Sequence, residues 1–378
     1  MNQLLIGLVG TLLATNQPQA VSNLIQQNAG LSVNLPNPND PAEKELEPLM
    51  ADDDAAMAEV DKWIRDNNAF TAQGAGESKT ELNARILARM NVVRKNYEDF
   101  LRRHPDFARG HLAYASFLNN IGDEDAAKLQ NEKALQLDPK NPAAWNNLGN
   151  YYGEYGPITN AFAYFAKAIE MDPNEPVYYQ NLAVTVYLYR TDAKTFYHLD
   201  EEQVFDKSLA LYRRAMQLDP DNFPLATEYA EGYYGIHPLR TNDALVAWTN
   251  TLHIAHDDIE REGVYIHLAR IKMLAGRYAE ARQQLDAVTN TMYSGLKDTL
   301  ERAITGHENG VTNSAAVGVS TKVSGFPTNQ ITAPTNPRPA LTNAIATPTN
   351  PPVFSPKIVK AMTHVPPQTP KVSDLSPS

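Results

Sequence analysis

The sequence predicts an all-α protein in which antiparallel helix pairs stack into a solenoid. The first observation is a period, because Pro105, Pro139 and Pro173 are each 34 residues apart. A proline cannot continue a helix but is tolerated in the first turn of the next one, so this spacing marks recurring helix boundaries. The second observation is composition, since helix-forming residues dominate up to about residue 304. Together they predict a helical repeat of constant length in the middle of the chain.

The best-preserved unit of this repeat begins at Pro142. Its first half places Trp145, Leu148 and Tyr152 at positions i, i+3 and i+7, which lie on one face of a helix. Two small residues stand where the helices of a pair must approach closely. The positions that we expect to pack the unit are Trp145, Leu148, Gly149, Tyr152, Ala161, Phe165, Ala168 and Pro173.

These residues and their spacing resemble the signature of the tetratricopeptide repeat family. Four neighbouring units keep part of the same pattern in register, so that about five units cover Ala108 to Val288. One unit is longer, because the step from Pro173 to Pro220 is 47 residues. We place this excess of 13 residues around Thr191–Gln203. The resemblance implies a tetratricopeptide superhelix over residues 105–304, closed by a capping helix from Leu296 to Ile304.

Further helices are expected before the repeats, over residues 40–104. Asp40-Pro41 and the capping box from Ser78 to Glu81 each mark a helix start. Pro48 is expected to interrupt the first of these helices. The helix after Ser78 has an apolar stripe up to Pro105, which suggests the second helix of an incomplete repeat.

The two ends of the chain differ from the repeats. Residues 4–14 form an apolar run too short to span a bilayer, so we expect residues 1–20 to be a signal peptide. Export to the periplasm or the extracellular space is the expectation, and a cytoplasmic protein with a packed N-terminal helix is the alternative. Residues 305–378 are expected to be a disordered tail, since 12 of the 26 prolines lie from Pro327 onward.

Composition and charge exclude several classes of function. The net charge is −11 and no concentrated basic run is present, which argues against nucleic acid as a partner. The chain has no cysteine, so it can form neither a disulfide nor a thiolate metal site. No nucleotide-binding or hydrolase motif occurs. We therefore predict no cofactor, no catalytic residue and no membrane span in the mature chain.

The expected function is that of a scaffold or adaptor that binds a protein or an extended peptide. The resemblance implies that the first helix of each unit lines the concave face. Side-chain amides there can pair with a peptide backbone of any sequence, although asparagine at these positions is also ordinary repeat consensus. The candidate peptide-binding residues are Asn146, Asn147, Asn150, Gln180, Asn181, Glu231 and Arg270.

The competing hypothesis is a metal-binding or enzyme-associated subunit. It would use the insertion at residues 191–203 or the cluster from His253 to Asp258, where two histidines and two aspartates fall within six residues. Two histidines three apart on a helix can share a metal. No third ligand is evident from the sequence, so a solvated helix end is the expected structure of this cluster.

Overall fold

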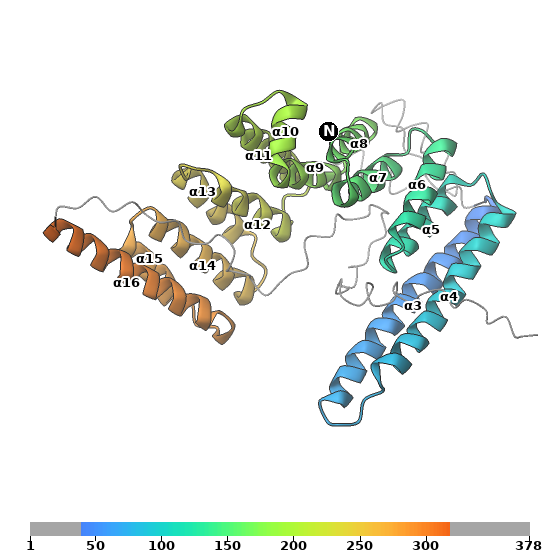
Figure 1. Ribbon diagram of the computed structural model, residues 1–378, viewed down its shortest axis with the longest axis horizontal. Helices are drawn as coiled ribbons and strands as arrows, with labels where there is room; N and C mark the ends of the chain where they lie inside the picture. The colour runs from blue at the N-terminus through green and yellow to red at the C-terminus, as the bar shows by residue number, and fades with distance from the viewer. Residues whose placement is uncertain (1–38, 318–378) are drawn as a thin grey trace, which may run out of the picture. The chain divides into compact units, whose positions relative to one another are not determined.

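The computed structural model describes the backbone of residues 39–317 and the side chains of residues 39–310. The predicted signal peptide at residues 1–20 and most of the predicted tail lie outside these residues. The described chain is helical, without strands, as the sequence predicts (Figure 1). Its α-helices are α3 (Pro41–Thr71), α4 (Lys79–Arg103), α5 (Ala108–Asn120), α6 (Glu124–Leu137), α7 (Pro142–Tyr155), α8 (Ile158–Met171), α9 (Pro176–Leu188), α10 (Arg190–Tyr197), α11 (Glu201–Leu218), α12 (Phe223–Glu231), α13 (Thr241–His253), α14 (Asp258–Leu274), α15 (Tyr278–Asp286) and α16 (Ser294–Val317).

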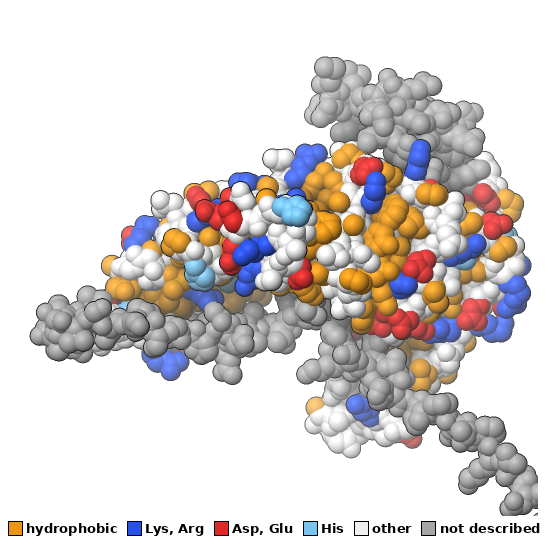
Figure 2. Space-filling view, turned by 45° about the horizontal axis from the view of Figure 1, so that its top comes forward, with side chains coloured by type: hydrophobic (Ala, Val, Ile, Leu, Met, Phe, Trp, Pro, Cys, Tyr) orange, Lys and Arg blue, Asp and Glu red, His pale blue; other side chains and the backbone are white. Residues whose placement is uncertain are grey.

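The described residues belong to two compact units that divide between Tyr151 and Tyr152, inside α7. The first unit contains α3 to α6 and most of α7, and the second contains the end of α7 and α8 to α16. Two short 3₁₀ turns, η1 (Gly232–Gly235) and η2 (Thr291–Tyr293), also belong to the second unit. On the face in Figure 2, Lys and Arg side chains are interspersed with Asp and Glu over the described surface.

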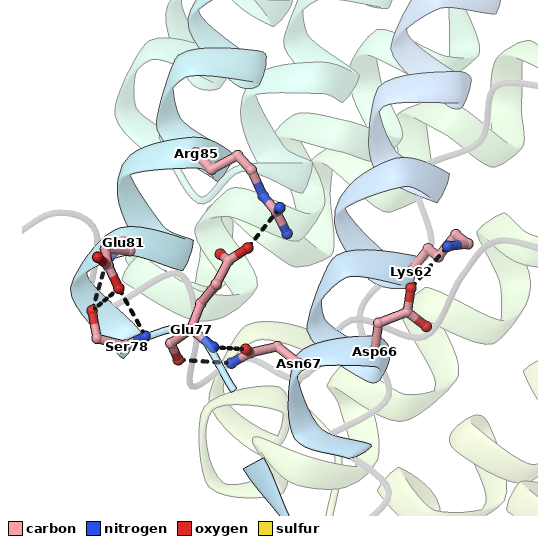
Figure 3. Close-up of polar contacts among 7 residues, drawn as sticks. All are labelled: Lys62, Asp66, Asn67, Glu77, Ser78, Glu81 and Arg85. Atoms are coloured by element: carbon pink, nitrogen blue, oxygen red, sulfur yellow. Dashed lines mark hydrogen bonds and ion pairs between the residues drawn. The ribbon is translucent and has the colours of Figure 1, made fainter. Parts of the chain in front are cut away.

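The first unit opens with a long antiparallel hairpin of α3 and α4 (Figure 1). Asp40 caps α3 by accepting a hydrogen bond from the Ala42 N–H at 2.8 Å. The capping box predicted at Ser78 is present at the start of α4. Between the two helices, the Asn67 side chain donates to the Glu77 carbonyl and accepts from the Glu77 N–H, at 3.3 and 2.7 Å (Figure 3). These bonds satisfy both backbone polar groups of Glu77, just before the N-cap of α4, and fix the turn.

The expected interruption of the first helix at Pro48 is wrong, because α3 runs unbroken from Pro41 to Thr71. A proline inside a helix costs about 3 kcal/mol through its missing N–H and its clash with the preceding turn. Leu46 and Leu49 flank this proline and are both buried in the core that α3 shares with α4. Burying each leucine contributes about 1.5–3 kcal/mol, which is enough to offset that cost.

The hairpin packs on α5, the first helix of the first repeat. The ring of Tyr97 on α4 stacks on that of Tyr114 on α5, with centroids 5.3 Å apart. At Gly110 a Cβ atom would lie only 2.5 Å from the Phe100 ring, so glycine is what lets α5 approach α4. The helix before the first complete repeat therefore packs as the sequence predicts.

In the second unit, α9 pairs with α11, α12 with α13, and α14 with α15. A buried hydroxyl recurs in two of these pairs. Ser208 on α11 donates to the Ala183 carbonyl of α9 at 2.9 Å. The Thr251 hydroxyl on α13 lies between the Ala226 carbonyl of α12 at 3.2 Å and the Ala247 carbonyl of its own helix at 3.0 Å. In both pairs donor and acceptor are 25 residues apart. Each hydroxyl joins the second helix of a pair to the first.

The predicted insertion is not a plain loop, because most of it forms the short helix α10. Phe196 and Tyr197 of α10 pack their rings against Phe162 on α8, with centroids 5.3 and 5.4 Å apart. Their aromatic area makes a packed helix more favourable than a solvated loop. The extra residues therefore add a short helix to this repeat, and that helix packs on α8.

The last helix extends beyond the predicted end of the solenoid. The predicted tail begins at residue 305, but α16 continues to Val317. No proline interrupts this stretch, since the next one in the chain is Pro327. Leu300 and Ile304 of α16 are buried with residues of α14 and α15, so α16 covers the end of the last helix pair. A capping helix is therefore present, and it is longer than predicted.

Candidate functional site: polar faces of the first helices

The asparagines predicted on the first unit's concave face lie on α7 and have buried side chains. Asn147 donates from its side-chain nitrogen to Oδ1 of Asn131 on α6 at 3.2 Å. Asn131 in turn donates to the Ala127 carbonyl at 3.1 Å. Asn147 thus joins α7 to the second helix of the preceding repeat. Asn146 and Asn150, which precede and follow Asn147 on the same helix, are also buried.

A hydrogen bond that the sequence analysis missed recurs at the start of three first helices. The ring N–H of Trp145 donates to the Pro139 carbonyl at 3.0 Å, six residues earlier. The Tyr179 hydroxyl donates to the Pro173 carbonyl at 3.2 Å, and the His111 ring nitrogen Nε2 lies 2.9 Å from the Pro105 carbonyl. These three side chains therefore serve helix positioning. The constant six-residue offset from each proline was visible in the sequence.

In the second unit, polar side chains connect the first helices of successive repeats. Gln180 on α9 donates to Oε2 of Glu228 on α12 at 3.0 Å. The Tyr212 hydroxyl donates to the same oxygen at 3.4 Å. Burial raises the pKa of Glu228, and these two hydrogen bonds oppose the rise. Asn181, the neighbour of Gln180 and another predicted site residue, is buried on α9.

Glu231 lies one helical turn after Glu228. Solvent reaches its side chain, although the surrounding helices crowd it. This crowding and the Glu228 carboxylate raise the pKa of Glu231, while the charge of Arg270 on α14 opposes the rise. No cation lies within ion-pair distance of Glu231 among the described side chains. Among the described residues, its carboxylate therefore has no ion-pair partner.

Arg270 stands beside an aromatic cluster on α14 and its neighbours. Its guanidinium lies 4.5 Å from the centre of the Tyr234 ring, and the Tyr234 hydroxyl bonds to Nδ1 of His267 at 3.0 Å. The His267 ring stacks on Trp248, with centroids 4.0 Å apart and planes 9° apart. Burial and the charge of Arg270 lower the pKa of His267 to about 4, so its imidazole is neutral at pH 7. Tyr234, His267 and Trp248 therefore position Arg270, but none of these three side chains carries a negative charge to pair with it.

Three of the predicted residues, Gln180, Glu231 and Arg270, therefore lie on three successive first helices of the second unit, and Arg270 is near enough to Glu231 to lower its pKa. An amide, a carboxylate and a guanidinium offer donors and acceptors for a polar chain. Asn146, Asn147 and Asn150 belong to the first unit. Two supporting residues outside the predicted set, Tyr212 and Trp248, lie on second helices, which the first-helix positions do not include.

The cluster from His253 to Asp258 is engaged in ordinary helix-end contacts. His253 is the last residue of α13, and Nδ1 of His256 contacts Oε2 of Glu260 at 2.9 Å. Asp257 caps α14, and Asp258 pairs with Arg261. Within the described residues, no three His, Asp or Glu side chains are placed to hold a metal ion. None of the helices in this part of the chain has both the length and the apolar composition to cross a membrane.

Comparison with known proteins matches residues 131–156 to the tetratricopeptide repeat family. No curated protein matches the chain. Among solved structures, it is similar to YrrB, described as a TPR protein with an unusual peptide-binding site, at 14% identity and a TM-score of 0.43, covering 55% of this chain and 97% of that one. It is also similar to the type IV pilus biogenesis factor PilW, at 20% identity and a TM-score of 0.42, covering 59% of this chain and 96% of that one. The similarity to Pseudomonas aeruginosa PilF has 15% identity and a TM-score of 0.41, covering 66% of this chain and 99% of that one.

Proposed function

We propose that this chain, which is a tetratricopeptide repeat protein, is a scaffold for protein interactions that holds an extended peptide along the first helices of its repeats. The observation that carries the peptide-binding role is the line of Gln180, Glu231 and Arg270 in the second unit. An extended peptide presents one backbone donor and one acceptor per residue, and these three side chains offer both kinds of partner.

The charges on this line favour a peptide with polar or charged side chains over an apolar one. Glu231 and Arg270 lie among helices that exclude part of the solvent, where charge-assisted hydrogen bonds are stronger than at an open surface. Each such bond contributes about 1.5–3 kcal/mol. The loss of one such bond therefore weakens binding about tenfold to a hundredfold, and the loss of two weakens it about a hundredfold or more.

Replacing Gln180, Glu231 and Arg270 together with alanine is expected to weaken peptide binding at least about tenfold. A ligand is first selected from a displayed library of unstructured peptides on the full chain, and its affinity is then measured by titration calorimetry. The matched control replaces Gln217, Glu170 and Lys167, which expose the same kinds of side chain on second helices of the same unit. Equal affinity of wild type and first-helix variant would contradict this peptide site.

Export is the second part of the proposal, supported by the apolar run at residues 4–14 and its length. We expect the protein purified from its native cells to lack the first 14 to 20 residues, because cleavage is expected after Ala14 or Ala20. N-terminal sequencing of that protein measures this directly. Recovery of an intact N-terminus would instead favour the cytoplasmic alternative.

A further inference from the structure

The first unit contains a buried carboxyl group that the proposed function does not use. Asp53 lies on the inner face of α3, and its side chain is 8% exposed. Its Oδ2 accepts a hydrogen bond from the Tyr97 hydroxyl of α4 at 3.0 Å. Its Oδ1 is buried and has no hydrogen-bond partner in the structure. One oxygen of this carboxyl group therefore lacks the donors that an ionised form needs.

The charged groups around Asp53 leave it without a compensating cation. Asp52 and Asp54 flank it on its own helix. The cation that faces it from α4 is Arg89, whose guanidinium is bonded to Asp52 at 2.7 Å and to Glu59 at 2.9 Å. Among the described side chains, no Lys, Arg or His lies within ion-pair distance of Asp53 itself.

On the α5 side, the groups near this carboxyl are occupied among themselves. The Tyr114 hydroxyl donates to Glu98 at 3.2 Å, and the Arg94 guanidinium pairs with Asp123 at 2.9 Å. Neither cations nor donors from α5 therefore reach the buried oxygen. The surroundings favour the neutral acid over the carboxylate.

Because the neutral acid is favoured, Asp53 gains and loses its proton near neutral pH. Burial raises its pKa from the usual value of about 4 to about 7, and Asp54 and Asp52 add to the rise. The Tyr97 hydrogen bond and the more distant Arg89 oppose it. The same burial and the adjacent carboxyl raise the pKa of Tyr97, so its hydroxyl remains a donor.

We propose that proton loss from Asp53 loosens the packing of α3 against α4, which makes this hairpin a pH-responsive element. The carboxylate is more stable in water than between the helices, so its formation favours opening of the hairpin. The contact extends to the repeats, because the Tyr97 ring packs on Tyr114 and Phe117 of α5. Opening of the hairpin would therefore also expose the outer side of the first repeat's first helix.

The direction of the pH effect follows from the two protonation states. Asp53 holds its proton more tightly in the packed hairpin than in the opened one, so packing is strongest below about pH 4, weakens as the pH rises to about 7 and levels off above it. With pKa values of about 7 closed and about 4 open, the opening constant is expected to rise about tenfold between pH 6 and pH 8.

Hydrogen exchange of the full chain, followed by mass spectrometry at pH 6 and pH 8 and corrected for the intrinsic exchange rates, tests this proposal. Protection of residues 42–60 and 86–100 should fall about tenfold in the wild type. In the Asp53→Asn variant, protection of the same segments should not depend on pH. The matched control is Asp54→Asn, which removes the same charge from an exposed neighbour. This variant should still lose protection as the pH rises, by a smaller factor, because burial contributes more than Asp54 to the raised pKa of Asp53.

Two results would overturn the proposal. One is equal corrected protection of the wild-type hairpin at both pH values, which needs no variant and is decisive even if Asp53→Asn does not fold. The other is loss of the pH response in Asp54→Asn as well as in Asp53→Asn, since this would assign the response to the general negative charge of α3.

Discussion

Replacing Trp248 with alanine is expected to lower the free energy of unfolding of the second unit by about 3–5 kcal/mol. The side chain is fully buried between Tyr234 and His267, and its ring stacks on the latter. Alanine would leave a cavity the size of an indole ring at the point where α13 and α14 meet. The same change would also remove the stacking partner of His267, which bonds to Tyr234, the ring beneath Arg270.

A second substitution at this position separates packing from polarity. The Trp248 Nε1–H is buried and has no hydrogen-bond partner, which costs about 1–3 kcal/mol in the folded state. Phenylalanine removes that donor but keeps much of the aromatic area, so Trp248→Phe is expected to cost clearly less than Trp248→Ala. Urea unfolding followed by circular dichroism measures both. Val246→Ala, at a 60% exposed position of the same helix, is the control, and a loss as large as that of Trp248→Ala would contradict this assignment.

The core of the repeats was predictable because packing in a helix pair follows a short, fixed spacing. Leu148, Ala161 and Phe165 were chosen from one unit by their match to the repeat signature, and all three are buried. The weaker units held their register for the same reason. At His111, where the sequence departs from the aromatic consensus, the ring still reaches the carbonyl of the preceding proline, as Trp145 does. A ring nitrogen at that position preserves the contact when the residue type changes.

The features that the sequence did not reveal depend on contacts between distant residues. Whether Pro48 ends a helix is decided by the burial of its neighbours against α4, which lies more than thirty residues further along. The local pattern of α10 suggested only an insertion, because its partner Phe162 belongs to another repeat. The burial of Asp53 likewise depends on Tyr97, 44 residues away. A run of three aspartates by itself resembles an exposed helix start.

The candidate site was predictable only in part, for a related reason. First-helix positions identified Gln180, Glu231 and Arg270, but periodicity could not tell an amide that faces a groove from one that joins two helices. Both amides join two helices, since Asn147 donates to Asn131 of the preceding second helix and Gln180 donates to Glu228 of the following first helix. The residue types are nearly the same, and only the partner distinguishes their roles.

Replacing Ile304 with asparagine is expected to lower the free energy of unfolding of the last helix pair by at least about 3 kcal/mol. Ile304 is fully buried among Ala269, Leu285 and Leu300, where α16 covers α14 and α15. Asparagine would lose this apolar contact and add an amide without evident partners. A terminal repeat that loses its cap exposes an apolar face, so aggregation is expected to accompany the loss of stability.

Hydrogen exchange localises this effect. Protection should fall in α14, α15 and α16, while α3 to α6 in the other unit should be unaffected. The loop before α16 is also tied to α14 by Glu262, which accepts hydrogen bonds from the Thr289 and Asn290 N–H groups at 2.8 and 2.7 Å. If these two bonds rather than apolar contact held the cap, Ile304→Asn would resemble the control Met292→Asn, at a 63% exposed position beside α16. Because Ile304 is fully buried against residues of α14 and α15, its replacement is expected to loosen the cap even though Glu262 keeps its hydrogen bonds.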